Sequence, residues 1–249
     1  MADKPEPSAK IRAVFFDLDD TLRVNDPHPH DVFTEFVSKQ GIAIGAADRQ
    51  DAFRWGHAYW ANSTTLLDDF EHHEGYEDPF WQNYTRRHLR SLNLDESTIE
   101  GLAPIVHKYM RHEYRPESKL VPQAIESLEK LRSSGYYVGL LTNRTRPIYQ
   151  EVVELGLDLH LDLFLTAGQL ETFKPQAGFF DQPLDLLKLE ADEVVYVGDN
   201  YFADVKGALE ANIRPVLIDP RGLYPDFEGL KVNTVAEIFN VLDIAESTN

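Results

Sequence analysis

Residues 14–22 read VFFDLDDTL, an apolar run that ends at three carboxylates and a threonine. We interpret the apolar part as a buried strand that carries the acids at its carboxyl end. In an open parallel sheet, ligands bind just outside that end, so acids placed there face a crevice. Alternation along an extended chain puts Asp17 and Asp19 on the same side. Two adjacent carboxylates repel each other unless a cation or a proton compensates them. Taken alone, the stretch is also compatible with a strand that ends in an acidic turn.

The composition is that of an ordinary globular protein, with 249 residues, 43% hydrophobic residues and a formal net charge of -18. A chain of this length forms one large domain or a core with a smaller unit. The acidic charge disfavours nucleic acid and anionic membranes as partners, so an anionic substrate would need local attraction from a metal, a lysine or backbone N–H groups. The absence of cysteine excludes disulfides, thiolate catalysis and cysteine-ligated zinc.

The chain termini carry no targeting signal that we recognise. Residues 1–10 have no apolar segment of a signal peptide, and no later run approaches the ~18 apolar residues of a membrane span. We therefore expect a cytoplasmic protein. Residues 1–9 are expected to form a disordered tail, and residues 247–249 are expected to fray.

Residues 24–116 predict a small unit of four helices, without strands, inserted into another domain. Residues 23–30 carry two prolines, which exclude a continuous helix and indicate a flexible exit from the first strand. Apolar periodicity predicts one helix that ends before Gly41 and a second over residues 46–60. A third opens at Pro79, and a capping-box pattern of Ser97 and Glu100 precedes the fourth.

After Pro116 apolar runs alternate with helical patterns. This alternation predicts βαβ units and a parallel sheet. We therefore expect an α/β core, residues 10–23 and 117–246, with a doubly wound parallel five-stranded sheet. Beyond the first strand at residues 11–17, the expected strands are 136–142, 163–166, 194–198 and 215–218, and the expected helices are 122–134, 146–155, 178–187 and 202–211.

Polar residues stand at or near the ends of the later strands. Thr142 and Asn143 follow one strand, Lys174 lies in a loop before a helix, and Asp199 follows another strand, with Asp204 five residues later. Each alone has a structural explanation, because threonine, asparagine and aspartate cap helices and lysine is usually solvated. Together they place acids, a hydroxyl donor and a cation at one sheet edge.

This set of residues suits phosphoryl chemistry. Asp17, Asp19 and Asp199 offer a hard oxygen site for Mg²⁺, and the metal with Lys174 would neutralise a phosphoryl group. Thr142 and backbone N–H groups after Asp17 would hold its oxygens. Asp17 could then attack phosphorus to give an aspartyl phosphate. Asp19 would protonate the leaving oxygen and afterwards take a proton from water.

These stretches resemble, in order, the four motifs of the haloacid dehalogenase (HAD) superfamily. They are DLDDT at 17–21, LTN at 141–143, Lys174-Pro175, and GDNYFAD at 198–204. The resemblance covers residues 10–23 and 117–246 and implies a HAD-like Rossmannoid core. It implies that the helical insert is a C1-type cap and that the protein is a Mg²⁺-dependent hydrolase of small phosphate monoesters.

The resemblance also implies a role for each matching residue. Asp17 would be the nucleophile and a metal ligand, and Asp19 the acid/base whose backbone carbonyl also binds the metal. Thr142, Asn143 and Lys174 would bind phosphate, Asp199 would ligate Mg²⁺, and Asp204 would lie at the metal or directly behind its ligands. The dehalogenases of the superfamily lack an aspartate two places after the nucleophile, so Asp19 favours phosphate esters. Asp20 receives no task.

Candidates for substrate specificity are weaker. Arg144 follows the second motif, where its loop would face the leaving group, and a surface position at a helix start explains it equally well. The insert holds all three tryptophans and eight of the nine histidines. Arg86, Arg87 and His88 could recognise an anion there, whereas the alternative is that these residues serve the packing of the insert itself. The run His72-His73-Glu74 does not predict zinc, because adjacent histidines do not share a helix face.

Two alternatives to a phosphatase remain open at this point. A phosphomutase of the same superfamily would pass its phosphoryl group to a sugar, and a non-catalytic HAD-fold protein would bind or regulate without turnover. The expected partner is a small phosphorylated metabolite. No pattern in the sequence predicts the particular ester or an oligomeric state.

Overall fold

The computed structural model describes residues 11–242, so the tail expected at residues 1–9 and the frayed end expected at 247–249 lie outside the described residues. The chain divides into two compact units. The core unit comprises Met1–Arg23 and Leu120–Asn249, and the helical unit comprises Val24–Lys119. The second boundary therefore falls three residues beyond the expected 116.

A six-stranded sheet in the order β5-β4-β1-β6-β7-β8 forms the centre of the core unit, and all of its paired strands are parallel. The strands are β1 (Ala13–Phe16), β4 (Tyr137–Thr142), β5 (Leu163–Thr166), β6 (Val194–Gly198), β7 (Arg214–Ile218) and β8 (Leu230–Val232). The predicted doubly wound parallel α/β class is confirmed. The predicted count of five strands is wrong, because β8 has three residues with a lysine at its centre and gives no apolar run.

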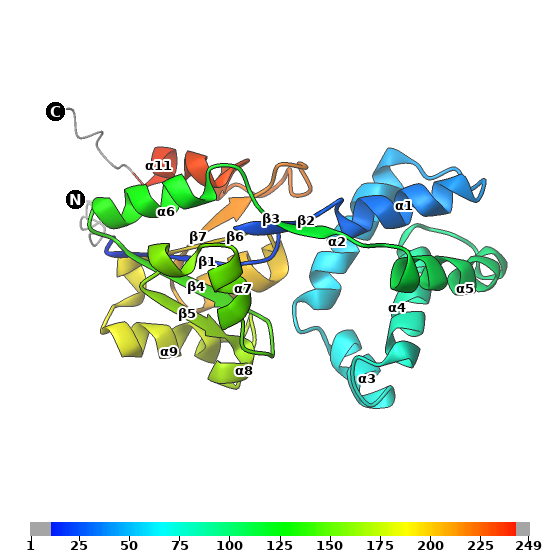
Figure 1. The fold of residues 1–249 in the computed structure, drawn as a ribbon, viewed down its shortest axis with the longest axis horizontal. Helices are drawn as coiled ribbons and strands as arrows, with labels where there is room; N and C mark the ends of the chain where they lie inside the picture. The colour runs from blue at the N-terminus through cyan, green and yellow to red at the C-terminus, as the bar shows by residue number, and fades with distance from the viewer. Residues whose placement is uncertain (1–10, 243–249) are drawn as a thin grey trace, which may run out of the picture. The chain divides into compact units, whose positions relative to one another are not determined.

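Helices cover both faces of this sheet (Figure 1). They are α6 (Ala124–Ser133), α7 (Tyr149–Glu154), α8 (Ala167–Leu170), α9 (Ala177–Leu187), α10 (Lys206–Glu210) and α11 (Ile238–Val241). The strand β1 is completely buried, and its side chains alternate between two clusters. Val14 and Phe16 pack with α6, whereas Ala13 and Phe15 pack with α9. Burial on both faces explains why β1 is a continuous apolar run.

Two core helices differ from their predicted bounds. The helix α7 begins at Tyr149 and not at 146, since Pro147 disfavours helical backbone at the residue before it. A loop therefore follows Thr142. The segment predicted as one helix over 202–211 is a π-helical turn, Tyr201–Val205, followed by α10. Both deviations lie immediately after strands whose ends carry candidate site residues.

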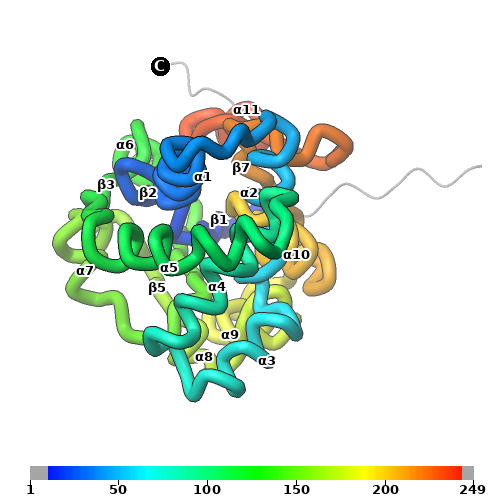
Figure 2. Tube along the Cα trace, turned by 90° about the vertical axis from the view of Figure 1, so that its right-hand side faces the viewer, coloured from blue at the N-terminus to red at the C-terminus, as the bar shows by residue number. Residues whose placement is uncertain are grey.

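The helical unit contains five helices, so the prediction of four is wrong. They are α1 (Pro29–Lys39), α2 (Ala46–Trp60), α3 (Thr64–His72), α4 (Asp78–Ser91) and α5 (Glu96–His112). The missed helix is α3, whose first turn is capped by the Ser63 hydroxyl, which accepts from Leu66 N at 3.1 Å. The N-cap of α5 is Asp95, which accepts from Thr98 N at 3.1 Å, so the predicted capping box of Ser97 and Glu100 is wrong. The helices α4 and α5 lie side by side (Figure 1, Figure 2).

The two chain segments at the unit boundaries are extended and pair with each other. They are β2 (Arg23–Asp26) and β3 (Glu117–Leu120), which form a two-stranded sheet. A turn precedes β2, in which Leu18 O accepts from Leu22 N and Arg23 N at 3.0 Å each. The expectations of a flexible exit and of no strand here are therefore wrong. Both strands are polar and short, and their pairing partner lies about ninety residues away in the sequence, so no local pattern predicts them.

The aromatic residues of the helical unit pack among themselves. Trp55, Trp60, Trp81 and Tyr84 lie against a buried cluster of Tyr59, Leu66 and Phe80. Arg87 pairs with the buried Asp69, whose other oxygen accepts from Tyr59 OH at 3.0 Å, and Arg86 pairs with Glu100. These contacts favour the packing interpretation of the insert's aromatic and cationic residues. Within residues 11–242, no helix has the length and apolar character needed to cross a membrane.

A pair of histidines, the buried His88 and the half-buried His30, lies between helices of the helical unit. His30 Nε2 lies 3.1 Å from the carbonyl oxygen of Arg49, which can only accept, and His30 Nδ1 lies 3.2 Å from His88 Nε2. The ring of His88 stacks on Phe33 at 3.9 Å. Burial, and then the charge of His30, lower the pKa of His88 well below 6.5. His88 is therefore neutral in the folded protein.

We predict that acid destabilises the helical unit through His88. Below pH 6.5 the unfolded chain binds a proton at residue 88, whereas His88 stays neutral in the folded protein. The free energy of unfolding therefore has its full value above pH 6.5 and decreases as the pH falls below it. The drop in Tm between pH 7.5 and 5.5 should be smaller in His88→Gln than in the wild type. Tryptophan fluorescence measures it, because all three tryptophans lie in this unit. The exposed His72→Gln is the matched control, and an equal drop in His88→Gln and the wild type would contradict the assignment.

Candidate active site

Three neighbouring strands deliver the predicted site residues to one edge of the sheet. In the register of the sheet, Phe16 on β1 lies beside Leu140 on β4 and Val197 on β6. Asp17 continues β1, and its backbone N–H donates to Val197 O at 2.9 Å. The residues that follow β4 and β6 emerge at the same level because parallel strands end together.

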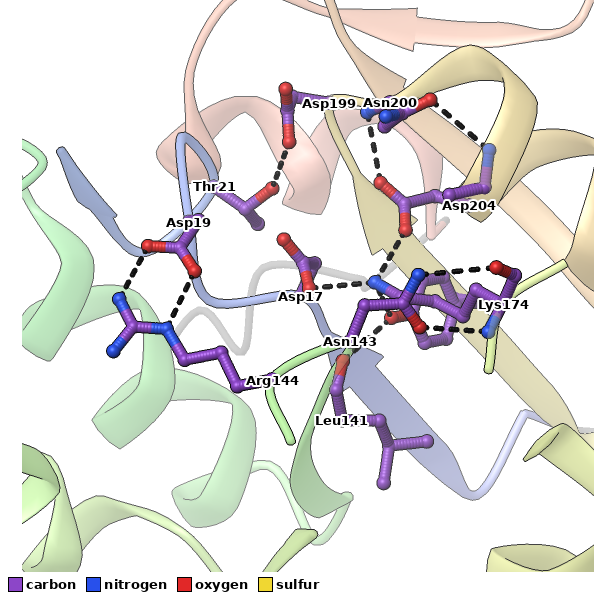
Figure 3. Close-up of polar contacts among 12 residues, drawn as sticks. Asp17, Asp19, Thr21, Leu141, Asn143, Arg144, Lys174, Asp199, Asn200 and Asp204 are labelled. Atoms are coloured by element: carbon purple, nitrogen blue, oxygen red, sulfur yellow. Dashed lines mark hydrogen bonds and ion pairs between the residues drawn. The ribbon is translucent and has the colours of Figure 1, made fainter. Parts of the chain in front are cut away.

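Lys174 is the centre of the site (Figure 3). Its ammonium Nζ lies 2.6 Å from Asp17 Oδ1, 2.7 Å from Asp204 Oδ1 and 3.0 Å from Tyr196 OH. All four side chains are buried. The hydroxyl of Tyr196 donates to Leu141 O at 2.8 Å, so it accepts from the lysine. Lys174 thus uses its three N–H donors on two carboxylates and one phenol.

Tyr196 is a site residue that sequence reasoning missed. It stands in the middle of the apolar strand β6 and is completely buried. A buried tyrosine needs a partner for its hydroxyl, and this requirement was the available signal. The partner itself, Lys174, could not be inferred from the sequence because it lies 22 residues away in a loop.

The site carries more negative than positive charge. Asp17, Asp199 and Asp204 each offer one oxygen, and these oxygens lie within 4.8 Å of one another. Three carboxylates and one ammonium leave two negative charges if all are ionised. Burial raises the pKa of Asp17 to about 7 despite the opposing charge of Lys174, with Asp204 and Asp19 adding to the rise. Burial, and then Asp20, raise the pKa of Asp199 well above 3.8.

This charge imbalance fits a divalent cation. Hard carboxylate oxygens are the ligands that Mg²⁺ takes in proteins, and a charge of +2 would compensate the excess. In residues 11–242 these three aspartates are the one group of three or more carboxylate, histidine or cysteine side chains close enough to share an ion. The residues present therefore match the expected cofactor in charge and in donor type.

The π-helical turn brings Asp204 back toward the end of β6. Asp204 Oδ2 accepts from Asn200 N at 2.8 Å, and Asn200 Oδ1 accepts from Phe202 N and Ala203 N at 3.0 and 3.1 Å. A Cβ atom at Gly198 would lie 2.1 Å from Asp204 Oδ2, so only glycine leaves room for this carboxylate. The fourth motif is thus a compact loop that folds its second aspartate against its own glycine.

Asn143 positions the lysine loop. Its Oδ1 accepts from Lys174 N at 2.7 Å, and its Nδ2 donates to Lys174 O at 3.1 Å. Both ends of the amide are used on the backbone of Lys174. The side chain of Thr142, the other predicted phosphate ligand from β4, is 2% exposed. Phosphate binding by Thr142 and Asn143 stays a prediction.

Asp19 faces away from the lysine and toward Arg144. Arg144 Nε and Nη2 lie 2.8 and 2.7 Å from its two carboxylate oxygens (Figure 3). Arg23 Nε lies 3.2 Å from Asp19 Oδ1. Burial alone would raise the pKa of Asp19, but the hydrogen bonds and charge of Arg144, followed by Arg23, lower it. Arg144 and Arg23 also pair with Glu151 on α7. Arg23 and Glu151 are contacts that the sequence did not predict.

Two residues of the first motif support the loop. Asp20 has a left-handed backbone with φ of 58°, and its N–H donates to Arg23 O at 2.7 Å. Thr21 Oγ1 donates to Asp199 Oδ1 at 3.3 Å. Asp20, which sequence reasoning left without a task, therefore shapes the turn and adds negative charge near Asp199.

The fold and this edge define a class of protein: a doubly wound α/β core with a buried lysine and an acidic site at the carboxyl ends of its strands. The family model of the haloacid dehalogenase-like hydrolases matches residues 11–212. The chain belongs to this family, as its four motifs suggested.

Known relatives include phosphatases and dehalogenases. The chain is 29% identical to a phosphoserine phosphatase from Thermus thermophilus, in an alignment that covers 92% of this chain and 98% of that enzyme. It is 40% identical over 108 residues to a ribulose-1,5-bisphosphate 5-phosphatase from Halopiger xanaduensis, covering 43% of this chain and 45% of that one. A solved dehalogenase with an intermediate complex superposes with a TM-score of 0.59 at 26% identity, covering 93% of this chain and 97% of that one.

We predict that Asp17→Asn raises the stability of the metal-free protein at pH 8. The substitution removes one of three neighbouring carboxylates, and the amide oxygen still accepts from Lys174. A gain of about 1 kcal/mol corresponds to about 2–4 °C in Tm for a protein of this size. Thermal melts in EDTA measure it.

Two further variants give the stability changes with which Asp17→Asn is compared. Lys174→Met leaves Asp17 and Asp204 without their cation and should cost about 3–5 kcal/mol. Asp185→Asn removes an exposed carboxylate on α9 and should stay within about 0.5 kcal/mol. A lower Tm for Asp17→Asn than for the wild type in EDTA would contradict the charge balance described above.

Proposed function

We propose that this protein is a Mg²⁺-dependent phosphatase of small phosphate monoesters that works through an aspartyl phosphate on Asp17. One observation carries the proposal: a buried carboxylate at the end of β1 lies 2.6 Å from a buried ammonium and within a group of three aspartates. The phosphoserine and ribulose-1,5-bisphosphate phosphatases among the relatives support this substrate class. In the same proposal, the helical unit serves as the cap.

The cation would be held by Asp17, Asp199 and Asp204, with the backbone carbonyl of Asp19 as a further ligand expected from the family resemblance. When bound, Mg²⁺ supplies positive charge that offsets the charge of the phosphoryl oxygens. Lys174 supplies a fixed positive charge beside Asp17, since two carboxylates and Tyr196 hold its ammonium in place. A dianionic phosphoryl group can therefore approach a carboxylate nucleophile.

The chemistry then follows in two steps. A carboxylate oxygen of Asp17 forms a bond to phosphorus while the bond to the leaving oxygen breaks, and Asp19 gives its proton to that oxygen. Water next attacks phosphorus, Asp19 takes a proton from the water, and inorganic phosphate leaves with the Asp17 carboxylate restored. Asp19 must turn from Arg144 toward the leaving group for both transfers.

A dehalogenase is the second candidate, because the family includes (S)-2-haloacid dehalogenase 4A of Burkholderia cepacia, which is 32% identical over 51% of this chain and 56% of that enzyme. A halide leaves carbon without needing a proton, whereas an alkoxide leaving from phosphorus needs one. Asp19 stands two residues after Asp17, where the dehalogenases of the superfamily lack an aspartate. This difference favours the phosphatase, and chloride release from 2-chloropropionate would favour the dehalogenase.

Two further alternatives differ from a phosphatase in their products. A phosphomutase would require a catalytic amount of a sugar bisphosphate and would release little inorganic phosphate. A binding or regulatory protein would release none from any ester. Phosphate release identifies the phosphatase, and formation of an isomeric sugar phosphate that depends on a sugar bisphosphate identifies the phosphomutase; a binding protein gives neither product.

We predict that Asp17→Asn lowers kcat by at least about 1000-fold, because the amide cannot act as the nucleophile. The wild type should hydrolyse esters from a panel of phosphorylated metabolites with Mg²⁺, lose activity in EDTA and regain it with excess Mg²⁺. Colorimetric phosphate release measures both effects, with Asp185→Asn as the control. Full turnover by Asp17→Asn, or turnover unaffected by EDTA, would rule out the proposal.

A further inference from the structure

The guanidinium of Arg144 lies between two carboxylates of the core unit. Along one edge of the guanidinium, Nε and Nη2 donate to the two oxygens of Asp19 at 2.8 and 2.7 Å, and Nη1 donates to Glu151. Arg23 Nε approaches both of these carboxylates at 3.2 Å. Two arginines and two carboxylates thus form a network without net charge. The edge that Asp19 occupies is the planar pair of donors that suits a carboxylate or a phosphate.

Arg144 is held in place independently of Asp19. Gly168 N on α8 donates to Arg144 O at 3.2 Å, and a Cβ atom at Gly168 would lie 1.9 Å from the carbonyl oxygen of Thr145. On the other side, Asn143 is bound to the backbone of Lys174 by two hydrogen bonds. With Glu151 also bound to the guanidinium, the donor edge of Arg144 would keep its position if Asp19 left.

The two ion pairs of the site differ in their access to solvent. The side chains of Lys174 and Asp17 are 3% and 9% exposed, whereas those of Arg144 and Asp19 are 29% and 41% exposed. Partly exposed ion pairs contribute little net stability because water and solutes compete for both partners. An anion from solution can therefore exchange with Asp19 on Arg144, but not readily with Asp17 on Lys174.

We propose that Arg144 binds a second anionic group of the substrate, a carboxylate or a phosphate on the leaving-group side, and that this group replaces Asp19 on the guanidinium. The inference rests on the proposed phosphatase function, because it is the leaving group that brings the second anion to Arg144. Exchange with a carboxylate conserves the charge of the network. Exchange with either group releases Asp19 to transfer protons. A substrate with a neutral leaving group leaves Asp19 bound to Arg144.

The test uses three esters that differ at one carbon. They are 3-phosphoglycerate, which carries a carboxylate, glycerol 1,3-bisphosphate, which carries a second phosphate, and glycerol 3-phosphate, which carries a neutral hydroxymethyl group. The wild type should prefer the two anionic esters over the neutral one by about 10- to 100-fold in kcat/KM, as expected for charge-assisted hydrogen bonds. The ratio between the two anionic esters identifies which group Arg144 takes.

Arg144→Gln should abolish this preference by raising KM and lowering kcat for the anionic esters. Arg144→Lys should keep part of it, because an ammonium retains the charge and loses the planar pair of donors. The matched control is Arg146→Gln, an exposed arginine two residues further along the same loop, which should keep the full preference. Thermal melts establish whether each variant is folded. If Arg144→Gln is not folded, Arg144→Lys alone tests the proposal.

A binding measurement separates this inference from the phosphatase proposal. Calorimetric titration of 3-phosphoglycerate and glycerol 3-phosphate into Asp17→Asn, with and without Arg144→Gln, should give the same loss of preference without turnover. Equal kcat/KM for all three esters in the wild type, or an unchanged preference in both Arg144 variants, would overturn the inference and leave the phosphatase intact. If no ester is hydrolysed, the phosphatase proposal fails, and the titration alone decides whether Arg144 binds a second anion.

Discussion

The buried ammonium of Lys174 is the interaction on which the rest of the site depends. Removing an ammonium from water is costly unless its donors are used and its charge is compensated. Asp17, Asp204 and Tyr196 do both, with Nζ distances of 2.6 to 3.0 Å. Several local features follow from this requirement. Asn143 holds the lysine backbone, and Gly198 leaves space for the Asp204 carboxylate that a Cβ atom would occupy.

The sequence predicted the strands whose formation follows from the pattern of their own residues. The strands at 163–166 and 194–198 were predicted with their observed bounds, since buried parallel strands are continuous apolar runs between turns. The convergence of the residues after β1, β4 and β6 followed from the parallel register alone. The short strands β2, β3 and β8 were missed because pairing with another strand, and not a pattern in their own residues, makes them strands.

The contacts of the site also divide into those that the sequence predicted and those that it did not. Motif positions predicted which residues meet at the edge, but not the partners of Asp19, because Arg144 and Arg23 act on it through side-chain geometry. Arg144 lies 125 residues from Asp19, and Arg23 lies 128 residues from Glu151. Tyr196 was missed for a related reason: its hydroxyl belongs to the site only because Lys174 Nζ lies 3.0 Å from it, and no spacing rule predicts that contact.

Asp17 and Asp19 are two residues apart, yet their surroundings shift their pKa values in opposite directions. Burial raises the pKa of Asp17 to about 7 against the pull of one lysine, whereas two arginines lower the pKa of the partly exposed Asp19. A cation on the three aspartates would favour the ionised form of Asp17, which is the form that attacks. The arginines favour ionised Asp19, which is the form that cannot give a proton. The arginines therefore favour the form of Asp19 that takes a proton from water, whereas both proton transfers require that Arg144 first release it.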